Sequence, residues 1–229
     1  MIKVKLFLRK CVNSNQSLVK KLLGIFIRLH NYSYKKITEY SSILNSGFNP
    51  KHEVTKYHDY FVSKVNNTDS VLDIGCGVGY LAYDIASKAK KVVGIDFSVP
   101  NIDNARSQYK RDNLEFVLGD VTTYNFKGQF DKLILSNVLE HIADRVALLK
   151  KIRALGGTLL FRVPMVDRDW VTVYKRDHGY PYKLDDTHET EYTLEQVKEE
   201  MKASGWIIES YQVNWGEFWG VLTRDDNFK

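Results

Sequence analysis

The chain has 229 residues, of which 44% are hydrophobic and 27% are charged. This composition is typical of a globular protein and excludes a wholly disordered, collagenous or coiled-coil chain. The two cysteines, Cys11 and Cys76, exclude a disulfide scaffold and a four-thiolate metal site. With no run of 18 apolar residues and no signal peptide in the sequence, we predict a cytoplasmic protein.

Positive charge is concentrated near the N-terminus. Residues 1–64 hold 12 Lys and Arg but only 3 Asp and Glu, which leaves 21 basic and 25 acidic residues in the remainder. The larger part of the chain is therefore mildly acidic, which is a poor electrostatic match for a nucleic-acid groove. A nucleic-acid partner is not expected.

The sequence predicts a basic helical segment at residues 1–50 and a main domain at 51–229. Within the segment, residues 16–30 carry an apolar stripe at helical spacing, with basic residues beside it. Two interpretations stay open: the stripe packs on the domain, or the helix makes a peripheral contact with an anionic membrane surface. The stripe is formed by Leu18, Leu22, Ile25, Phe26 and Leu29, and the basic residues are Lys20, Lys21 and Arg28.

From residue 70 onward, short β-branched runs alternate with helical stretches. This alternation predicts an α/β fold with a doubly wound, Rossmann-like parallel sheet and helices on both faces. A helix at 51–65 precedes the sheet, and an irregular insert at 164–192 is long enough to be functional. The expected strands are 70–74, 91–95, 114–118, 130–136 and 157–163; the expected helices are 78–88, 99–111, 143–154 and 193–204; two further strand candidates are 206–214 and 217–223.

The most informative segment is VLDIGCGVGY at residues 71–80, where a buried strand runs into a glycine turn and a helix. Such a turn lets the backbone approach a ligand at the carboxyl end of a parallel strand. The dinucleotide fingerprint requires a glycine where Tyr80 stands, which disfavours a nicotinamide-dependent dehydrogenase. Asp73 precedes the turn, and its carboxylate would disfavour a pyrophosphate but suit an ammonium or sulfonium group.

Two further acids end the next two strands. Asp96 follows the second strand, where it can accept hydrogen bonds from both ribose hydroxyls. Asp120 follows the third strand, within reach of an adenine amino group. Helix capping and turn formation are the structural alternatives for each acid, but all three in order indicate an adenosine ligand that carries positive charge.

This order of segments resembles the class I S-adenosylmethionine-dependent methyltransferases, especially the small-molecule type 11 group. The resemblance covers about residues 52–223 and rests on the glycine turn, Asp96, Asp120 and the run FDKLILSNVLEHI at 130–142. It implies S-adenosyl-L-methionine as cofactor and an antiparallel pair of C-terminal strands that closes the sheet. The cofactor-binding residues that it implies are Asp73, Gly75, Cys76, Gly77, Gly79, Asp96, Phe97, Asp120, Val121, Ser136 and Asn137.

Methyl transfer to a hydroxyl requires a base, and the chain offers few. His141 follows the fourth strand and should face the cleft, while His188 lies in the insert before a helix that Thr193 caps. We take His141 and His188 as the candidate catalytic residues. A histidine that only braces its loop is the alternative for each.

Candidate acceptor contacts come from two regions. The helix at 51–65, which folds over the cofactor as a lid in the family, brings His52 and Tyr57. The insert brings Asp167, Asp169, His178 and Tyr192. Packing is the alternative for the aromatic residues. No metal site is predicted, because His178, His188 and Asp169 lack a ligand-spacing signature.

The leading hypothesis is a methyltransferase for a small or glycan-like acceptor, with oxygen as the methylated atom. The alternatives are methylation of RNA or protein, and a cofactor-binding partner that does not catalyse. The loop Ser136-Asn137-Val138-Leu139 contains no proline, unlike the loops that act on base amino groups.

Overall fold

The computed structural model describes residues 15–228, so Cys11 and the first 14 residues of the predicted basic segment lie outside the described residues. The chain divides into two compact units. One comprises residues 1–54 and 170–182, and the other comprises 55–169 and 183–229. Within the described range, no helix is long and apolar enough to cross a membrane.

The first unit is helical. Its main element, α2 (Gln16–Leu44), begins where the Asn15 side chain accepts a hydrogen bond of 3.0 Å from the Leu18 amide. The predicted helix is thus real but extends beyond residue 30 to Leu44. The insert, predicted to be irregular, contains α8 (Trp170–Asp177), and Lys175 Nζ of this helix donates a 2.7 Å hydrogen bond to Asn31 Oδ1 of α2.

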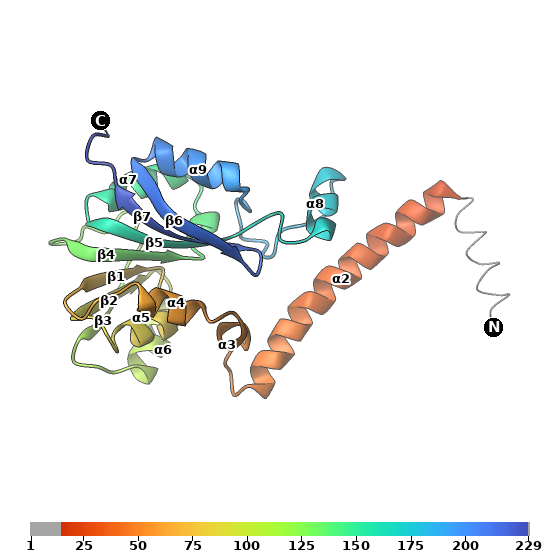
Figure 1. Ribbon diagram of the computed structural model, residues 1–229. Coiled ribbons are helices and arrows are strands. Elements are labelled where there is room, and N and C mark those ends of the chain that lie inside the picture. The colour runs from red at the N-terminus through yellow and green to blue at the C-terminus, as the bar shows by residue number, and fades with distance from the viewer. Residues whose placement is uncertain (1–14, 229) are drawn as a thin grey trace. The chain divides into compact units, whose positions relative to one another are not determined.

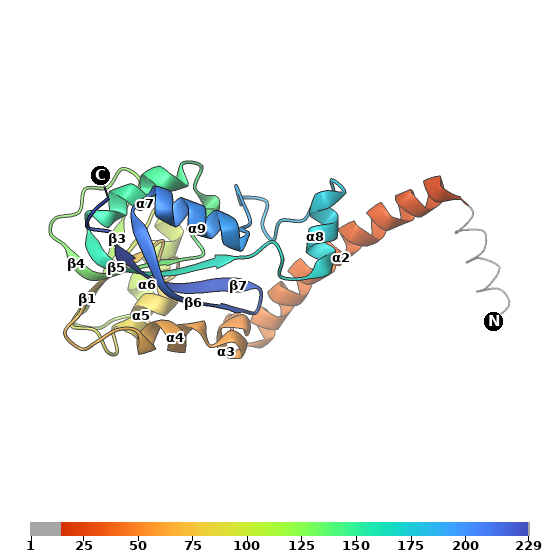
Figure 2. The same ribbon diagram turned by 45° about the horizontal axis from the view of Figure 1, so that its top comes forward.

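The second unit contains a seven-stranded sheet in the order β3-β2-β1-β4-β5-β7-β6 (Figures 1 and 2). The first five strands are parallel, whereas β7 runs antiparallel between β5 and β6. The predicted fold class and the closing antiparallel pair are confirmed. The strands are β1 (Ser70–Ile74), β2 (Lys91–Asp96), β3 (Leu114–Leu118), β4 (Phe130–Ser136), β5 (Gly156–Pro164), β6 (Trp206–Asn214) and β7 (Glu217–Arg224).

Helices cover both faces of this sheet, because its central strands are apolar on both sides. Figures 1 and 2 show α7 (Arg145–Arg153) and α9 (Leu194–Ala203) on one face and α4 (Tyr57–Ser63), α5 (Tyr80–Ile85) and α6 (Val99–Gln108) on the other. Each face has its own core, with Leu149 and Met201 in the first and Phe61 and Ile85 in the second.

The expected helix at 51–65 is two helices. The first is α3 (Lys51–Thr55), and the second is α4. Lys56 lies between them with a φ of 54°, a left-handed conformation that interrupts the helical path.

The topology determines where a ligand can enter. β1 lies between β2 and β4, so the chain leaves β1 toward one side of the sheet and returns on its other side. Loops diverge at such a reversal and open a crevice at the carboxyl ends of the strands. The glycine turn after β1 and the short helix η1 (Leu139–His141) after β4 both lie at this edge.

We expect Ile134→Ala to lower the free energy of unfolding by about 2–5 kcal/mol, because Ile134 is fully buried and truncation leaves a cavity. The matched control is Ile207→Ala in β6, where the side chain is half exposed and the cost should stay near 0.5 kcal/mol. Urea denaturation of both variants measures the difference, and equal losses would contradict the assignment of Ile134 to the core.

Candidate functional site

The glycine turn combines left-handed backbone with close packing. Gly75, Gly77 and Gly79 have φ angles of 70°, 55° and 89°, which side-chain-bearing residues rarely adopt. A Cβ at Gly75 would lie 2.4 Å from Val138 Cγ2, whereas a Cβ at Gly77 would meet no atom within 4 Å. Gly75 therefore allows the β1 and β4 loops to approach each other, and Gly77 leaves open space beside the turn.

The carboxylate of Asp96 holds this turn in place. Asp96 Oδ2 accepts a 2.9 Å hydrogen bond from the Gly77 amide, and Oδ1 accepts one of 2.9 Å from the Ser98 amide. Asp120 Oδ1 similarly accepts from the amide and hydroxyl of Thr122 at 2.8 and 2.7 Å. Both acids thus have the turn-forming contacts that the structural alternative predicted, while each still lines the cavity described next.

A cavity of about 470 Å³ opens at the carboxyl ends of β1 to β4. It brings together predicted residues from four separate segments of the chain, and a fifth segment contributes Thr187, which was not predicted. Of the predicted cofactor and catalytic residues, Asp73, Cys76, Gly77, Gly79, Ser136 and His188 are not in its wall. The wall is formed by Gly75, Ile95, Asp96, Phe97, Gly119, Asp120, Val121, Asn137, Val138, His141, Ile142 and Thr187.

Asp73 lies next to the end of β1 as a buried carboxyl group. It is only 2% exposed, and within the described chain its Oδ2 has no hydrogen-bond partner. Burial, reinforced by the negative charge of Asp96, raises the pKa of Asp73 to about 7. A cationic group placed here would therefore find an acceptor that the protein itself does not satisfy.

Asn137 provides a second such atom at the end of β4. Its φ is 54°, and its side-chain Oδ1 is buried with no partner among residues 15–228. Its backbone amide donates 2.8 Å to the Arg162 carbonyl, which fixes the turn. The neighbouring Ser136 is instead held within the protein, because its hydroxyl accepts from Arg162 Nη1 at 3.2 Å.

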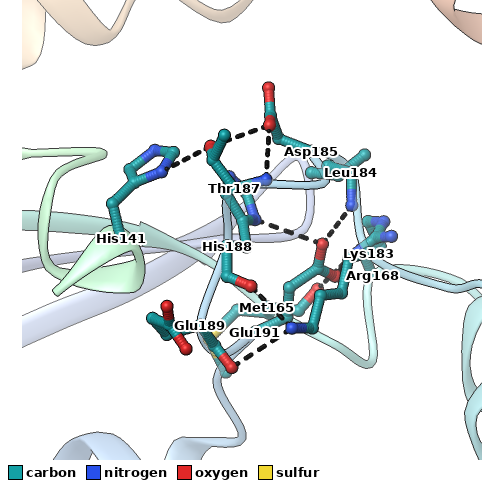
Figure 3. A network of polar contacts seen from close by, with 10 residues as sticks. All are labelled: His141, Met165, Arg168, Lys183, Leu184, Asp185, Thr187, His188, Glu189 and Glu191. Atoms are coloured by element: carbon teal, nitrogen blue, oxygen red, sulfur yellow. Dashed lines mark hydrogen bonds and ion pairs between the residues drawn. The ribbon is translucent and has the colours of Figure 1, made fainter. Parts of the chain in front are cut away.

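The two predicted catalytic histidines meet at the edge of this cavity (Figure 3). Their rings pack edge to face with centroids 4.6 Å apart. Thr187 Oγ1 lies 2.9 Å from His141 Nδ1 and donates a 2.8 Å hydrogen bond to Asp185 Oδ1. Burial, together with the neighbouring His188, lowers the pKa of His141, so its ring is neutral at physiological pH.

His188 is 7% exposed. Its Nδ1 lies 3.4 Å from Glu191 Oε1, within the distance of an ion pair. Glu191 also pairs with Arg168 and accepts from the Leu184 amide (Figure 3). These hydrogen bonds outweigh burial and lower the pKa of the Glu191 carboxyl. The network connects both ends of the returning segment 183–191 to the domain.

Several functional groups at this edge were not singled out from the sequence. Glu140 is fully buried beside His141, and burial raises its pKa to about 7. Arg162 and Glu217 form a buried ion pair of 2.7 Å. In the sequence, Glu140 is visible only as an acid within Leu139–His141, and Arg162 and Glu217 only as charges in otherwise apolar strands. These signals do not indicate where the side chains lie in the fold.

The predicted acceptor contacts are scattered. Tyr192 is fully buried in the core, and its hydroxyl donates a 2.8 Å hydrogen bond to Glu200 Oε2. Tyr192 is therefore a core residue, as the packing alternative predicted. Tyr57 is 7% exposed, with Arg162 Cζ at 3.6 Å from its ring centroid. Asp167 and Asp169 are exposed in the second unit, and His52 and His178 belong to the first.

Comparison with known proteins supports a family assignment. Residues 71–155 match the model of a family described as "Methyltransferase domain". (S)-coclaurine N-methyltransferase of Papaver somniferum is 31% identical over 131 residues, which are 49% of this chain and 37% of that protein. Ubiquinone biosynthesis O-methyltransferase of Histophilus somni is 28% identical over 131 residues, 51% of this chain and 55% of that protein. The chain spans between about a third and a half of these relatives.

Solved structures share the fold. Magnesium protoporphyrin IX methyltransferase from Synechocystis PCC 6803, solved with bound SAH, has a TM-score of 0.61 at 18% identity, covering 74% of this chain and 83% of that one. The N-methyltransferase NodS from Bradyrhizobium japonicum WM9 has a TM-score of 0.57 at 14% identity, covering 75% and 87%.

The sheet order, the glycine turn and the strand-end carboxylates define a Rossmann-like domain built for a nucleoside ligand. Residues 71–155 match the methyltransferase-domain model, and this match and the shared fold together support assignment to the class I S-adenosylmethionine-dependent methyltransferases.

The raised pKa of Asp73 predicts a pH-dependent stability. The carboxyl ionises near 3.8 in the unfolded chain and near 7 in the folded one, so the folded state holds the proton more tightly. The resulting stabilisation is present at low pH and is lost as the pH rises through about 7, at up to about 1.4 kcal/mol per pH unit. We expect Asp73→Asn to make this slope shallower, with the raised pKa of Glu140 supplying the part that remains, as measured by urea denaturation of the ligand-free protein at several pH values. Equal slopes in wild type and variant would contradict the prediction.

Proposed function

We propose that the chain is an S-adenosyl-L-methionine-dependent methyltransferase that methylates a small or glycan-like acceptor at a hydroxyl oxygen. The observation that carries the proposal is the cavity at the carboxyl ends of β1 to β4. A glycine turn, Asp96 and Asp120 line it together with His141. Relatives named as N- and O-methyltransferases support the reaction class without choosing the acceptor.

The residues present fit this cofactor. Two of the buried side-chain oxygens that have no hydrogen-bond partner among residues 15–228, Asp73 Oδ2 and Asn137 Oδ1, are acceptors, which suits an ammonium group. The acids Asp96 and Asp120 would repel phosphate but can accept hydrogen bonds from ribose hydroxyls and an adenine amino group. The open space beside Gly77 leaves room for the ligand.

When bound, S-adenosyl-L-methionine supplies an electrophilic methyl carbon whose leaving group is a neutral thioether. The protein's task is then to hold the acceptor oxygen about 3–3.5 Å away and in line. His141 and His188 are the groups that we expect to activate the acceptor hydroxyl. His141 lines the cavity with a neutral ring, so it has a lone pair available.

The acceptor side supports oxygen chemistry and a polar molecule. Thr187 and His141 form the cavity wall there, and the exposed Asp167 and Asp169 lie in the same unit. Methylation of RNA or protein, or cofactor binding without catalysis, are the alternatives that an acceptor panel distinguishes.

We expect isothermal titration calorimetry to show binding of S-adenosylmethionine and S-adenosylhomocysteine but not of NAD. Asp96→Ala should weaken binding roughly tenfold to a hundredfold, because charge-assisted hydrogen bonds are lost and the turn loses its support at Gly77.

Asp103→Ala is the matched control, since Asp103 is exposed on α6 outside the cavity wall. Its affinity should equal that of the wild type. NAD binding, or full affinity in Asp96→Ala, would overturn the proposed function. Methyl transfer to a polysaccharide or phenolic member of an acceptor panel would support it further.

A peripheral membrane contact through α2 is a second proposal. Ile25, Phe26 and Leu29 are each more than half exposed. The helix carries five basic residues and one acidic residue, which suits an anionic lipid surface.

We expect the full chain to sediment with vesicles that contain phosphatidylserine and to remain in solution with neutral phosphatidylcholine vesicles. Phe26→Asp should abolish most of this binding, because a charge replaces a large apolar side chain. Ser17→Asp adds the same charge at an exposed polar position and should retain it. No sedimentation of the wild type would favour packing of the apolar stripe instead.

A further inference from the structure

Three metal-ligating side chains converge beside the cavity. Glu140, His141 and His188 each offer one ligand atom, and these atoms lie within 4.8 Å of one another. The ligand atoms of one zinc ion lie about 3.4 Å apart. A small movement of these three side chains toward one another would therefore bring their ligand atoms to zinc-binding distances. Two of these residues come from η1 and the third from the returning segment, so only the fold brings them together.

Glu140 supplies the independent evidence. It is fully buried, and neither of its carboxylate oxygens has a hydrogen-bond partner in the part of the chain that the structure describes. The guanidinium of Arg162 is already engaged by both oxygens of Glu217, at 2.7 and 2.9 Å. A buried charge is normally paired or bound to a metal, and this carboxylate lacks a protein partner.

The two histidines are oriented by their neighbours. Thr187 has one hydroxyl proton and gives it to the Asp185 carboxylate, so the hydroxyl accepts from His141 Nδ1. The lone pair of His141 is therefore on Nε2. At His188, Nδ1 lies 3.4 Å from Glu191 Oε1 and has no hydrogen-bond partner among the described residues, so this contact does not decide which ring nitrogen carries the lone pair. A carboxylate or hydroxyl behind a histidine is the usual outer support of a metal ligand.

We propose that Glu140, His141 and His188 bind a divalent transition-metal ion. Two imidazole nitrogens and one carboxylate oxygen form the donor set of catalytic zinc sites, which keep a further position open. The same donors accept cobalt, iron and manganese, whereas calcium and magnesium prefer oxygen ligands alone. This revises our expectation from the sequence that the chain has no metal site.

The role of the ion rests on the proposed function. His141 and Thr187 line the cavity, so the ion would lie at its wall. An acceptor hydroxyl in the open position would have its pKa lowered by the ion and release its proton to water. The oxygen then forms a bond to the methyl carbon as the carbon–sulfur bond breaks, and that electron pair leaves on sulfur. A lone pair that binds the ion does not also take the proton, so the histidines would act as ligands.

Binding is tested with the tag-free chain after treatment with EDTA, using Co²⁺ alone as a spectroscopic probe. We expect one Co²⁺ per chain, with visible absorption bands of a nitrogen- and oxygen-bound ion, and displacement by Zn²⁺. Glu140→Gln and His188→Ala should each weaken binding at least about tenfold.

The matched control is His30→Ala, which removes an exposed histidine outside the cluster and should bind Co²⁺ as the wild type does. Circular dichroism and S-adenosylhomocysteine affinity report whether the variants fold, since Glu140 and His188 do not line the cavity. No Co²⁺ binding by the wild type, or equal binding by Glu140→Gln, overturns the site. Neither readout requires methyl transfer, so this failure is distinct from failure of the proposed function.

The role in catalysis is tested once an acceptor is found. The EDTA-treated chain should lose at least about tenfold in turnover and regain it with Zn²⁺ or Co²⁺, while S-adenosylmethionine affinity stays unchanged. Turnover that is the same with and without metal overturns the role of the ion and makes His141 the base.

Discussion

The central physical constraint in this structure is the burial of two carboxyl groups that have no neutralising partner among the described residues. Asp73 lies next to the end of β1 and Glu140 follows β4; both are buried, and at least one oxygen of each has no hydrogen-bond partner among residues 15–228. Burial of an unpaired charge is costly, and both pKa values rise to about 7 as a result. A fold does not usually retain such groups for its own stability. We propose that a positive group from outside the chain compensates each of them: the cationic cofactor near Asp73 and a metal ion at Glu140.

The sheet makes this arrangement possible, because it is apolar on both faces and its parallel strands end together. The reversal between β1 and β4 separates the loops that follow them, and Gly75 allows those loops to approach closely where they meet Val138. Asp96 then ties the glycine turn to the next strand end. The cofactor side of the cavity thus combines the glycine turn with two acids, Asp96 and Asp120, and apolar side chains such as Phe97 and Val121.

The acceptor side is built differently. A segment that returns from the insert brings Thr187 and His188 to His141, and Glu191, Arg168 and the Leu184 amide hold it there (Figure 3). The backbone amide of Glu189 also donates 2.7 Å to the Glu140 carbonyl, so the segment is attached directly to η1. The relatives share about half of this chain, and their names cover both nitrogen and oxygen acceptors. The family model matches residues 71–155, which include the glycine turn, Asp96, Asp120 and His141 but not the segment that carries Thr187 and His188.

The sequence by itself determined the alternation of strands and helices, the glycine turn and the acids at three strand ends, because these features depend on residues close together in the chain. It also indicated His141 and His188 as separate candidate catalytic residues, but not that their rings meet. It could not show that Tyr192 is enclosed in the core, that α8 interrupts the insert, or that Glu140 is buried with no hydrogen-bond partner in the described part of the chain. Burial and convergence depend on contacts between segments such as 139–141 and 183–191, about 45 residues apart. Local periodicity carries no information about such contacts, so only the tertiary structure decided which polar groups lose water and which of them meet.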